Sequence, residues 1–167
     1  MIAKVQPRAA VFWRPFSCYN VLMELKSLGK FFKVWYPSIL MMILIFTMSS
    51  FAADESDQQS GLIVNALTFA FPELKNVSFL VNIVRKTAHF LEYAIFGFFA
   101  ARAFKLSKKS PFFAVLLCGI YAATDEFHQT FIPGRSGEVA DVLLDTTGAT
   151  FGAFIYWFFA KKQRKHS

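Results

Sequence analysis

The chain has 167 residues, enough for one soluble domain, but 55% of them are hydrophobic, 22 are phenylalanine, and the formal net charge is +7. The apolar residues form long unbroken blocks, which excludes the mixed amphipathic pattern of a water-soluble core. The basic residues gather beside these blocks, before residue 35, at 102–109 and at 161–165. This placement is typical of a membrane protein oriented by its basic connections, and it excludes a nucleic-acid-binding patch.

A basic, aromatic leader, residues 1–34, precedes the first apolar block. Within it, residues 21–33 are predicted either to form an amphipathic helix at the inner headgroup layer or to remain without order. The leader, the apolar residues 39–48 and the small residues near 50–53 imitate the three parts of a secretory signal. Because the leader is longer than in the usual signal, we interpret 35–53 as a retained membrane span.

Four apolar segments, near residues 35–53, 86–104, 111–131 and 141–160, have the length of a membrane span. A helix needs roughly 20 residues to cross a hydrocarbon layer of about 30 Å. Because lipid offers no partner to backbone polar groups, these segments should be helical. The sequence therefore predicts an all-α fold, an integral membrane bundle of four transmembrane helices over 35–160, with a basic tail at 161–167.

Both termini are predicted to be cytoplasmic, because the basic blocks lie before the first span, between the second and third, and after the fourth. Cys18 would then be cytoplasmic and Cys118 would lie in mid-membrane, so no disulfide is expected between them.

The connection between the first two spans contains two apolar runs, 61–71 and 77–84, that are too short to cross a membrane. Apolar residues recur at helical spacing from 62 to 71, and Pro72 ends the run. We therefore predict a short helix over 62–71, either interfacial or re-entrant.

Polar side chains cluster at the outer ends of the last three spans. A charged side chain at the centre of a membrane helix costs roughly 2.5–3.5 kcal/mol on insertion scales, so several at one depth indicate a role. At helical spacing the polar residues of each span share one side: Lys86, His89, Glu92 and Tyr93; then Tyr121, Asp125, His128 and Gln129; then Asp141 and Asp145.

The fourth span indicates which way its carboxylates face. Asp141 and Asp145 continue along the same stripe into Gly148 and Gly152. A GxxxG stripe is the small-residue surface along which membrane helices approach closely. We therefore predict that both carboxylates face protein and not lipid.

Three chemistries fit these residues, and the sequence leaves them open. A His–carboxylate pair could act as a general base on an ester or phosphoester of a lipid. Lys86 and Arg135 could hold a phosphate or carboxylate headgroup. A divalent metal is the third, and its candidate ligands are His89, Glu92, His128 and Asp125. The alternative without a ligand is a buried ion-pair network that fixes the register of the helices.

Several kinds of chemistry are excluded for this chain. It contains no glycine-rich phosphate loop, no serine-centred nucleophile elbow and no CxxC pair. Nucleotide-driven transport by this chain alone, serine hydrolysis of that type and thiol redox work are therefore not expected.

Three blocks of sequence, in the same order and spacing, resemble the VanZ-like family: 86–93 with Gly97, 125–129 with 131–135, and Asp141 and Asp145 with Gly148. The end of the first span at 48–50, with 58–60 after it, also resembles the family's opening. The resemblance covers roughly residues 37–160 and leaves the basic leader and tail outside. His128 departs from the pattern expected in many relatives.

The resemblance implies a bacterial inner-membrane protein, and the family is named after a member linked to resistance to the lipid-bearing glycopeptide teicoplanin. It implies no settled reaction, so whether the protein is an enzyme, whether it holds a metal and how it oligomerises stay open. We expect it to bind or modify a lipid or lipoglycopeptide at the outer leaflet.

The residues expected to act fall into two groups. Candidate catalytic residues are His89, Glu92, Asp125, Glu126, Asp141 and Asp145. Candidate binding residues are Lys86, Tyr93, Gln129 and Arg135. Two alternatives come from other classes: a non-enzymatic protein that alters envelope partitioning through its fold or partners, and an ion or proton pathway. The pathway is the less favoured, because the inner half of the predicted bundle is almost wholly apolar.

Overall fold

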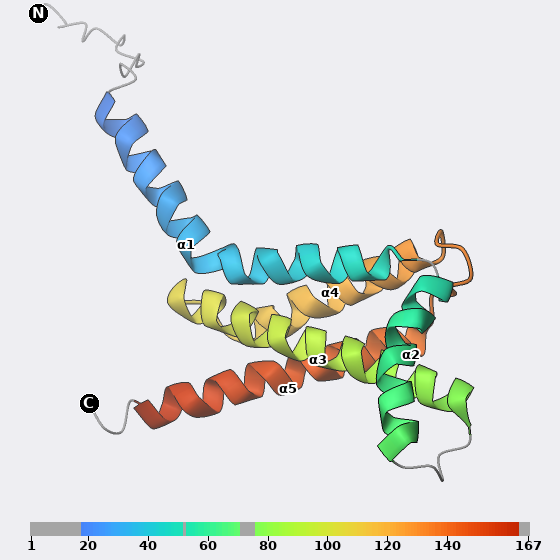
Figure 1. Ribbon diagram of the computed structural model, residues 1–167. Coiled ribbons are helices and arrows are strands. Elements are labelled where there is room, and N and C mark those ends of the chain that lie inside the picture. Colours follow the sequence, from blue (N-terminus) through green and yellow to red (C-terminus); the bar gives the residue numbers. More distant parts are fainter. Residues whose placement is uncertain (1–17, 52, 71–75, 164–167) are drawn as a thin grey trace, which may run out of the picture. The chain divides into compact units, whose positions relative to one another are not determined.

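The computed structural model describes residues 18–51, 53–70 and 76–163. Within these ranges the regular structure consists of five α-helices and no strand (Figure 1). The helices are α1 (Cys18–Ser49), α2 (Ala53–Ala70), α3 (Val77–Leu106), α4 (Phe112–Gln129) and α5 (Val139–Gln163). The all-α prediction is confirmed. The predictions for residues 1–17, for Pro72 and for 164–167 lie outside the described residues.

The chain divides into two units, residues 1–33 and 34–167. In the first unit α1 is helical from Cys18 onward, so the helical alternative predicted for 21–33 is the one observed. Leu25, Leu28, Phe31 and Phe32 each expose more than half of their surface in this unit. The second unit contains the rest of α1 and the four other helices.

Two helices are longer than the apolar runs predicted. The short helix predicted over 62–71 begins at Ala53 in the structure, so α2 also contains the acidic stretch before residue 60. The runs 77–84 and 86–104, predicted as separate, form one continuous helix, α3, of 30 residues. Apolar length alone missed this, because Arg85 and Lys86 interrupt hydropathy but continue a helix readily.

Two segments among the described residues are long and apolar enough to cross a membrane, Leu25–Ser49 in α1 and Val139–Lys162 in α5. The segments of α3 and α4 that were predicted to cross the membrane are not long and apolar enough by the same criterion, because ionisable residues interrupt their apolar stretches. The structure therefore does not show the four spans that the sequence predicts.

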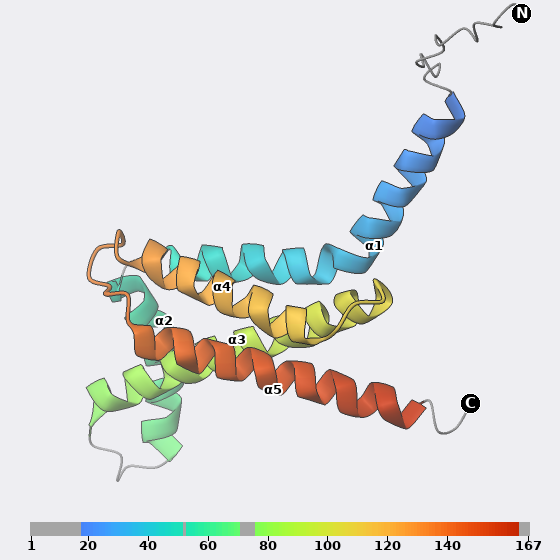
Figure 2. The same cartoon turned by 180° about the vertical axis from the view of Figure 1, so that it is seen from behind.

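Within the second unit, α5 packs against α3 along much of its length, α4 contacts both, and α2 packs on α3 (Figures 1 and 2). The core between them is apolar and contains Tyr93, Phe96, Ala100, Cys118 and Ala149, with Met41 and Ile45 from α1. Many large apolar side chains lie exposed on the outer faces, Phe127, Leu143 and Phe154 among them. Such a surface is typical of a protein covered by lipid or by a partner.

Small residues allow α3 and α5 to approach closely. A Cβ atom placed on Gly148 would overlap the backbone carbonyl of Phe90, and one on Gly152 would overlap that of Ala94. Gly97 of α3 faces the backbone of Ala149 in the same way. The prediction that the glycine stripe of α5 packs against protein is confirmed, and this approach sets the depth of the polar residues that precede it.

Candidate functional site

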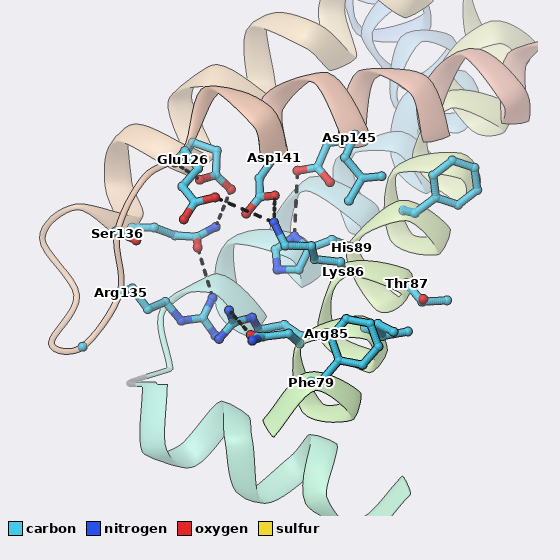
Figure 3. A pocket seen from close by; sticks show the side chains of 17 residues that line it. Phe79, Arg85, Lys86, Thr87, His89, Glu126, Arg135, Ser136, Asp141 and Asp145 are labelled. Carbon is cyan, nitrogen blue, oxygen red and sulfur yellow. Dashed lines mark hydrogen bonds and ion pairs between the residues drawn. The ribbon is translucent and has the colours of Figure 1, made fainter. Parts of the chain in front are cut away.

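A cavity of about 700 Å³ lies between α3, the end of α4, the α4–α5 loop and the first turns of α5 (Figure 3). Its size is in the range of small-molecule pockets. Phe79, Ile83 and Phe90 give it an apolar side. Its remaining lining is dominated by charged and polar residues: Asn82, Arg85, Lys86, His89, Glu126, Gln129, Arg135, Glu138, Asp141 and Asp145.

An ion pair between α3 and α5 forms one part of the rim. The Nζ atom of Lys86 donates a hydrogen bond to Oδ1 of Asp141 (Figure 3). Glu138 lies 3.8 Å from the same ammonium group. The side chain of Lys86 is 42% exposed and that of Asp141 25% exposed. Water therefore shares in solvating this pair.

A chain of hydrogen bonds ties the end of α4 to the α4–α5 loop. Arg135 donates through Nη1 to Oε1 of Gln129 at 3.2 Å. Nε2 of Gln129 in turn donates to Oε1 of Glu126 at 3.2 Å and to Oδ2 of Asp125 at 3.3 Å. The other oxygen of Glu126 accepts from the backbone N–H of Glu138 at 2.9 Å. The loop that carries Arg135 into the cavity is thus held by buried side chains of α4.

The sharp turn in this loop depends on one glycine. Gly134 has a φ of 75°, and the backbone N–H of Arg135 bonds back to the carbonyl of Ile132 at 3.1 Å. Glycine adopts this positive φ without strain, whereas a residue with a side chain would be strained there.

Deeper in the bundle, His89, Asp125 and Asp145 come together from α3, α4 and α5. One ligand atom from each lies within 4.8 Å of the other two. Asp145 is fully buried, Asp125 is 3% exposed, and the His89 side chain is 17% exposed. Nδ1 of His89 lies 3.8 Å from Oδ2 of Asp145 (Figure 3). Asp125 also accepts a hydrogen bond of 2.9 Å from Ser49 of α1.

Helical spacing explains the two levels of the site. Lys86 and His89 lie about one turn apart on α3, and Asp141 and Asp145 lie one turn apart on α5. Because the two helices pack side by side, Lys86 meets Asp141 at the rim and His89 meets Asp145 below it. The result is a cavity with a mixed-charge rim, an apolar side and a buried acidic floor.

A comparison with protein families identifies the family of this chain. A family model described as VanZ/LLP1 matches residues 34–160. The chain belongs to the VanZ/LLP1 family. The resemblance inferred from the three sequence blocks is therefore confirmed. Comparison with curated proteins and with solved structures gives no match.

Most of the residues predicted for the site lie at this end of the VanZ/LLP1 fold. The cavity is lined by Lys86, His89, Glu126, Gln129, Arg135, Asp141 and Asp145. Asp125 lies behind them, in the cluster with His89 and Asp145. The predicted faces of three helices thus meet in one place.

Three predicted residues lie elsewhere. Tyr93 is fully buried in the apolar core, where its ring packs against Phe96 and Tyr121. Glu92 is half-buried on α3 and is not among the described residues that line the cavity. His128 stacks on Phe46 of α1 with ring centroids 4.6 Å apart. Of the four predicted metal ligands, only His89 and Asp125 are in the buried cluster, and its third member is Asp145.

Sequence reasoning also missed partners that the structure supplies. Ser49 was not among the residues predicted for the site, yet it donates a hydrogen bond to Asp125. Glu138 at the start of α5 takes part in the rim through its carboxylate and its backbone N–H. Its position three residues before Asp141 was the available signal, but only the fold of the loop brings Glu138 to Lys86.

Proposed function

We propose that this VanZ/LLP1 protein spans the bacterial inner membrane four times, with both termini cytoplasmic, and binds a lipid or lipoglycopeptide at the outer leaflet. The headgroup would enter the cavity between Lys86 and Arg135. The proposal includes modification of that ligand by the buried residues of the floor. By the family resemblance, a lipoglycopeptide such as teicoplanin is the candidate ligand of medical interest.

The observation that carries the proposal is the composition of the cavity. Lys86 and Arg135 come from different elements and line the same space of about 700 Å³. Guanidinium and ammonium groups are the side chains that bind phosphate and carboxylate most strongly, and arginine can do so through two parallel hydrogen bonds. Phe79 and Ile83 on the α3 side would meet the apolar part of an amphipathic ligand.

The exposed apolar surface supports a location in lipid. Ile120 and Phe127 of α4, Leu91 of α3 and Phe151 of α5 are each at least half exposed. Burying such residues in hydrocarbon is favourable, whereas water disfavours them. A pocket that opens among lipid-covered helices would receive a ligand from the membrane, with its chains remaining in the acyl layer.

A proton or ion pathway is a weaker candidate. It would need polar groups through the whole thickness of the bundle. Below Asp145, the packed residues of α3 and α5 are apolar: Phe96, Ala100, Ala101, Ala149 and Ala153. This core supports a pocket closed at its lower end.

The headgroup proposal is tested by the lipids that remain bound after purification in mild detergent, identified by mass spectrometry. Wild-type protein should retain one class of anionic lipid above its share of the membrane. Arg135→Gln and Lys86→Gln should each reduce that enrichment about tenfold, since a lost charged hydrogen bond is worth about 1.5–3 kcal/mol. Lys109→Gln, an exposed lysine in the α3–α4 connection, is the matched control.

The same variants separate binding from a general effect on the membrane. Teicoplanin susceptibility of cells should change with Arg135→Gln and Lys86→Gln but not with Lys109→Gln. Equal lipid enrichment in all four proteins would contradict the headgroup proposal. Orientation is checked by an impermeant thiol reagent, which should label a cysteine at Ser136 from outside the cell and fail to label one at Lys108.

A further inference from the structure

The floor of the cavity holds two carboxylates and an imidazole that take no part in binding the headgroup. Asp125 comes from α4, Asp145 from α5 and His89 from α3. Each contributes one ligand atom to a group whose members are within 4.8 Å of one another. Three helices therefore each direct one buried or half-buried ionisable side chain to a single point.

These carboxylates lack the partners that buried carboxylates normally have. Among the described residues, none donates a hydrogen bond to either oxygen of Asp145 or to Oδ1 of Asp125. Asp145 is fully buried, and Nδ1 of His89, at 3.8 Å, is too far for a hydrogen bond. Buried polar groups without partners are rare in native proteins, and each calls for a specific cause.

Two neighbouring buried carboxylates need a positive charge, because the free energy of an uncompensated charge in a low-dielectric interior is high. The nearest lysine does not supply it, because Lys86 bonds to Asp141 at the rim. Ser49 and Gln129 donate to Oδ2 of Asp125, which leaves Oδ1 directed to other partners. A bound cation or a shared proton can therefore supply the charge that the cluster lacks.

We propose that His89, Asp125 and Asp145 bind one divalent transition-metal ion, such as Zn²⁺ or Mn²⁺. One imidazole nitrogen and two carboxylates form a donor set that suits these ions, whereas Ca²⁺ and Mg²⁺ prefer oxygen ligands alone. The hydrogen bonds from Ser49 and Gln129 to Asp125 are of the kind that orient a metal-binding carboxylate.

The separations fit an ion after a small adjustment. Ligands at about 2.0–2.2 Å from one tetrahedral ion lie about 3.3–3.6 Å from each other. The three atoms, within 4.8 Å of one another, would need to move inward by at most about 0.8 Å each. Rotation of the carboxylate and imidazole groups about their side-chain torsions supplies that movement without a change in the backbone.

The position of the site gives it a role beyond neutralising charge. His89 and Asp145 line the cavity, whereas Asp125 lies behind them. An ion held by all three has its remaining coordination positions directed into the cavity. There it can accept a phosphoryl or carbonyl oxygen of a ligand as a Lewis acid, or hold a water molecule. The cluster's geometry carries this inference, which does not depend on the headgroup proposed above.

The test measures metal content of the full chain, purified without a histidine tag, stripped with a chelator and re-exposed to Zn²⁺ or Mn²⁺. After gel filtration, elemental analysis should find one ion per wild-type chain, and the ion should raise the melting temperature. His89→Gln and Asp145→Asn should each weaken binding by at least about tenfold. Thr147→Ala, on an exposed face of α5 two residues from Asp145, should bind as the wild type does.

If the variants fold poorly, a spectroscopic measurement on the wild-type protein still tests the proposal. Mn²⁺ bound to the wild-type chain should show magnetic coupling to one imidazole nitrogen in pulsed electron paramagnetic resonance. Absence of that coupling, or of stoichiometric binding of both metals by wild-type protein, would overturn the proposal. The carboxylates would then share a proton. Metal binding by protein that retains no lipid would support this site and contradict only the headgroup proposal.

Discussion

Lys86 with Asp141 and His89 with Asp145 are successive polar pairs across the same two helices, yet their surroundings differ. The first pair is a direct ion pair whose side chains are 42% and 25% exposed. The second is 3.8 Å apart, with side chains that are 17% and 0% exposed. The two pairs lie one helical turn apart. In the first pair, the opposite charge and water stabilise both groups, whereas in the second pair they do not.

The difference predicts how much each pair contributes to folding. Partly exposed ion pairs contribute modestly to stability and tolerate loss of one partner, because water replaces it. A buried carboxylate without a hydrogen-bond donor destabilises the protein that carries it, so its presence points to a role outside folding. The rim pair aligns α3 with α5 and lines the cavity, and the inner group is the part to which we assign a metal ion.

The largest effect on stability should come from substitutions that prevent the close approach of α3 and α5, since this approach positions both pairs. Gly152→Leu or Gly148→Leu would push α5 away from the backbone of α3 and destabilise the fold by about 3 kcal/mol or more. Melting temperature in detergent and protein level in membranes would both fall. Thr150→Leu, on an exposed face of the same helix, should leave both close to wild type.

Equal tolerance of leucine at Gly148, Gly152 and Thr150 would show that α5 does not pack on α3 through this stripe. Ala149 is unsuitable as a control despite its position beside Gly148, because it is fully buried against Gly97.

A smaller effect on stability is expected from removing Ser49, which donates a hydrogen bond to Asp125 in the buried cluster. Ser49→Ala deletes the 2.9 Å hydrogen bond to Asp125, and loss of a hydrogen bond to a buried charged acceptor costs about 1.5–3 kcal/mol. Ser50→Ala is the matched control, because that exposed hydroxyl bonds only to the carbonyl of Phe46 in its own helix. Equal melting temperatures for the two variants would remove Ser49 from the site.

The smallest effect should be the coupling within the rim pair. A double-mutant cycle with Lys86→Gln and Asp141→Asn should give a coupling free energy of about 0.5–1 kcal/mol, in the range of partly exposed ion pairs. It should decrease as salt is added, since water and ions screen the pair. A coupling of several kcal/mol that is insensitive to salt would mean that the rim is as shielded as the floor.

The helical fold, the polar faces of three helices and the glycine stripe could be predicted because each depends on the spacing of residues along one helix. Lys86 and His89, or Asp141 and Asp145, fall on one face of a helix wherever that helix is placed. The continuity of α3 was missed because charged residues at 85 and 86 end an apolar run without ending a helix.

The membership of the inner cluster could not be predicted, because it depends on how the helices are rotated against one another. His128 and Asp125 lie about one turn apart on α4, yet His128 turns to Phe46 of α1 and Asp125 turns to His89 and Asp145. Tyr93 shares a face with His89 but lies one turn deeper, where the neighbouring side chains are apolar. Both outcomes are set by packing between helices that are distant in the sequence.

The most direct test of the account is the melting temperature of Asp145→Asn against wild type, with both proteins in excess chelator. If the inner carboxylates serve a ligand, removing one buried charge relieves repulsion, and the new amide can donate to Asp125. The variant should then melt at the wild-type temperature or about 2–4 °C above it, as a gain of about 1 kcal/mol would give. A melting temperature several degrees lower, with reduced protein in the membrane, would show that Asp145 is part of the scaffold and would contradict the account.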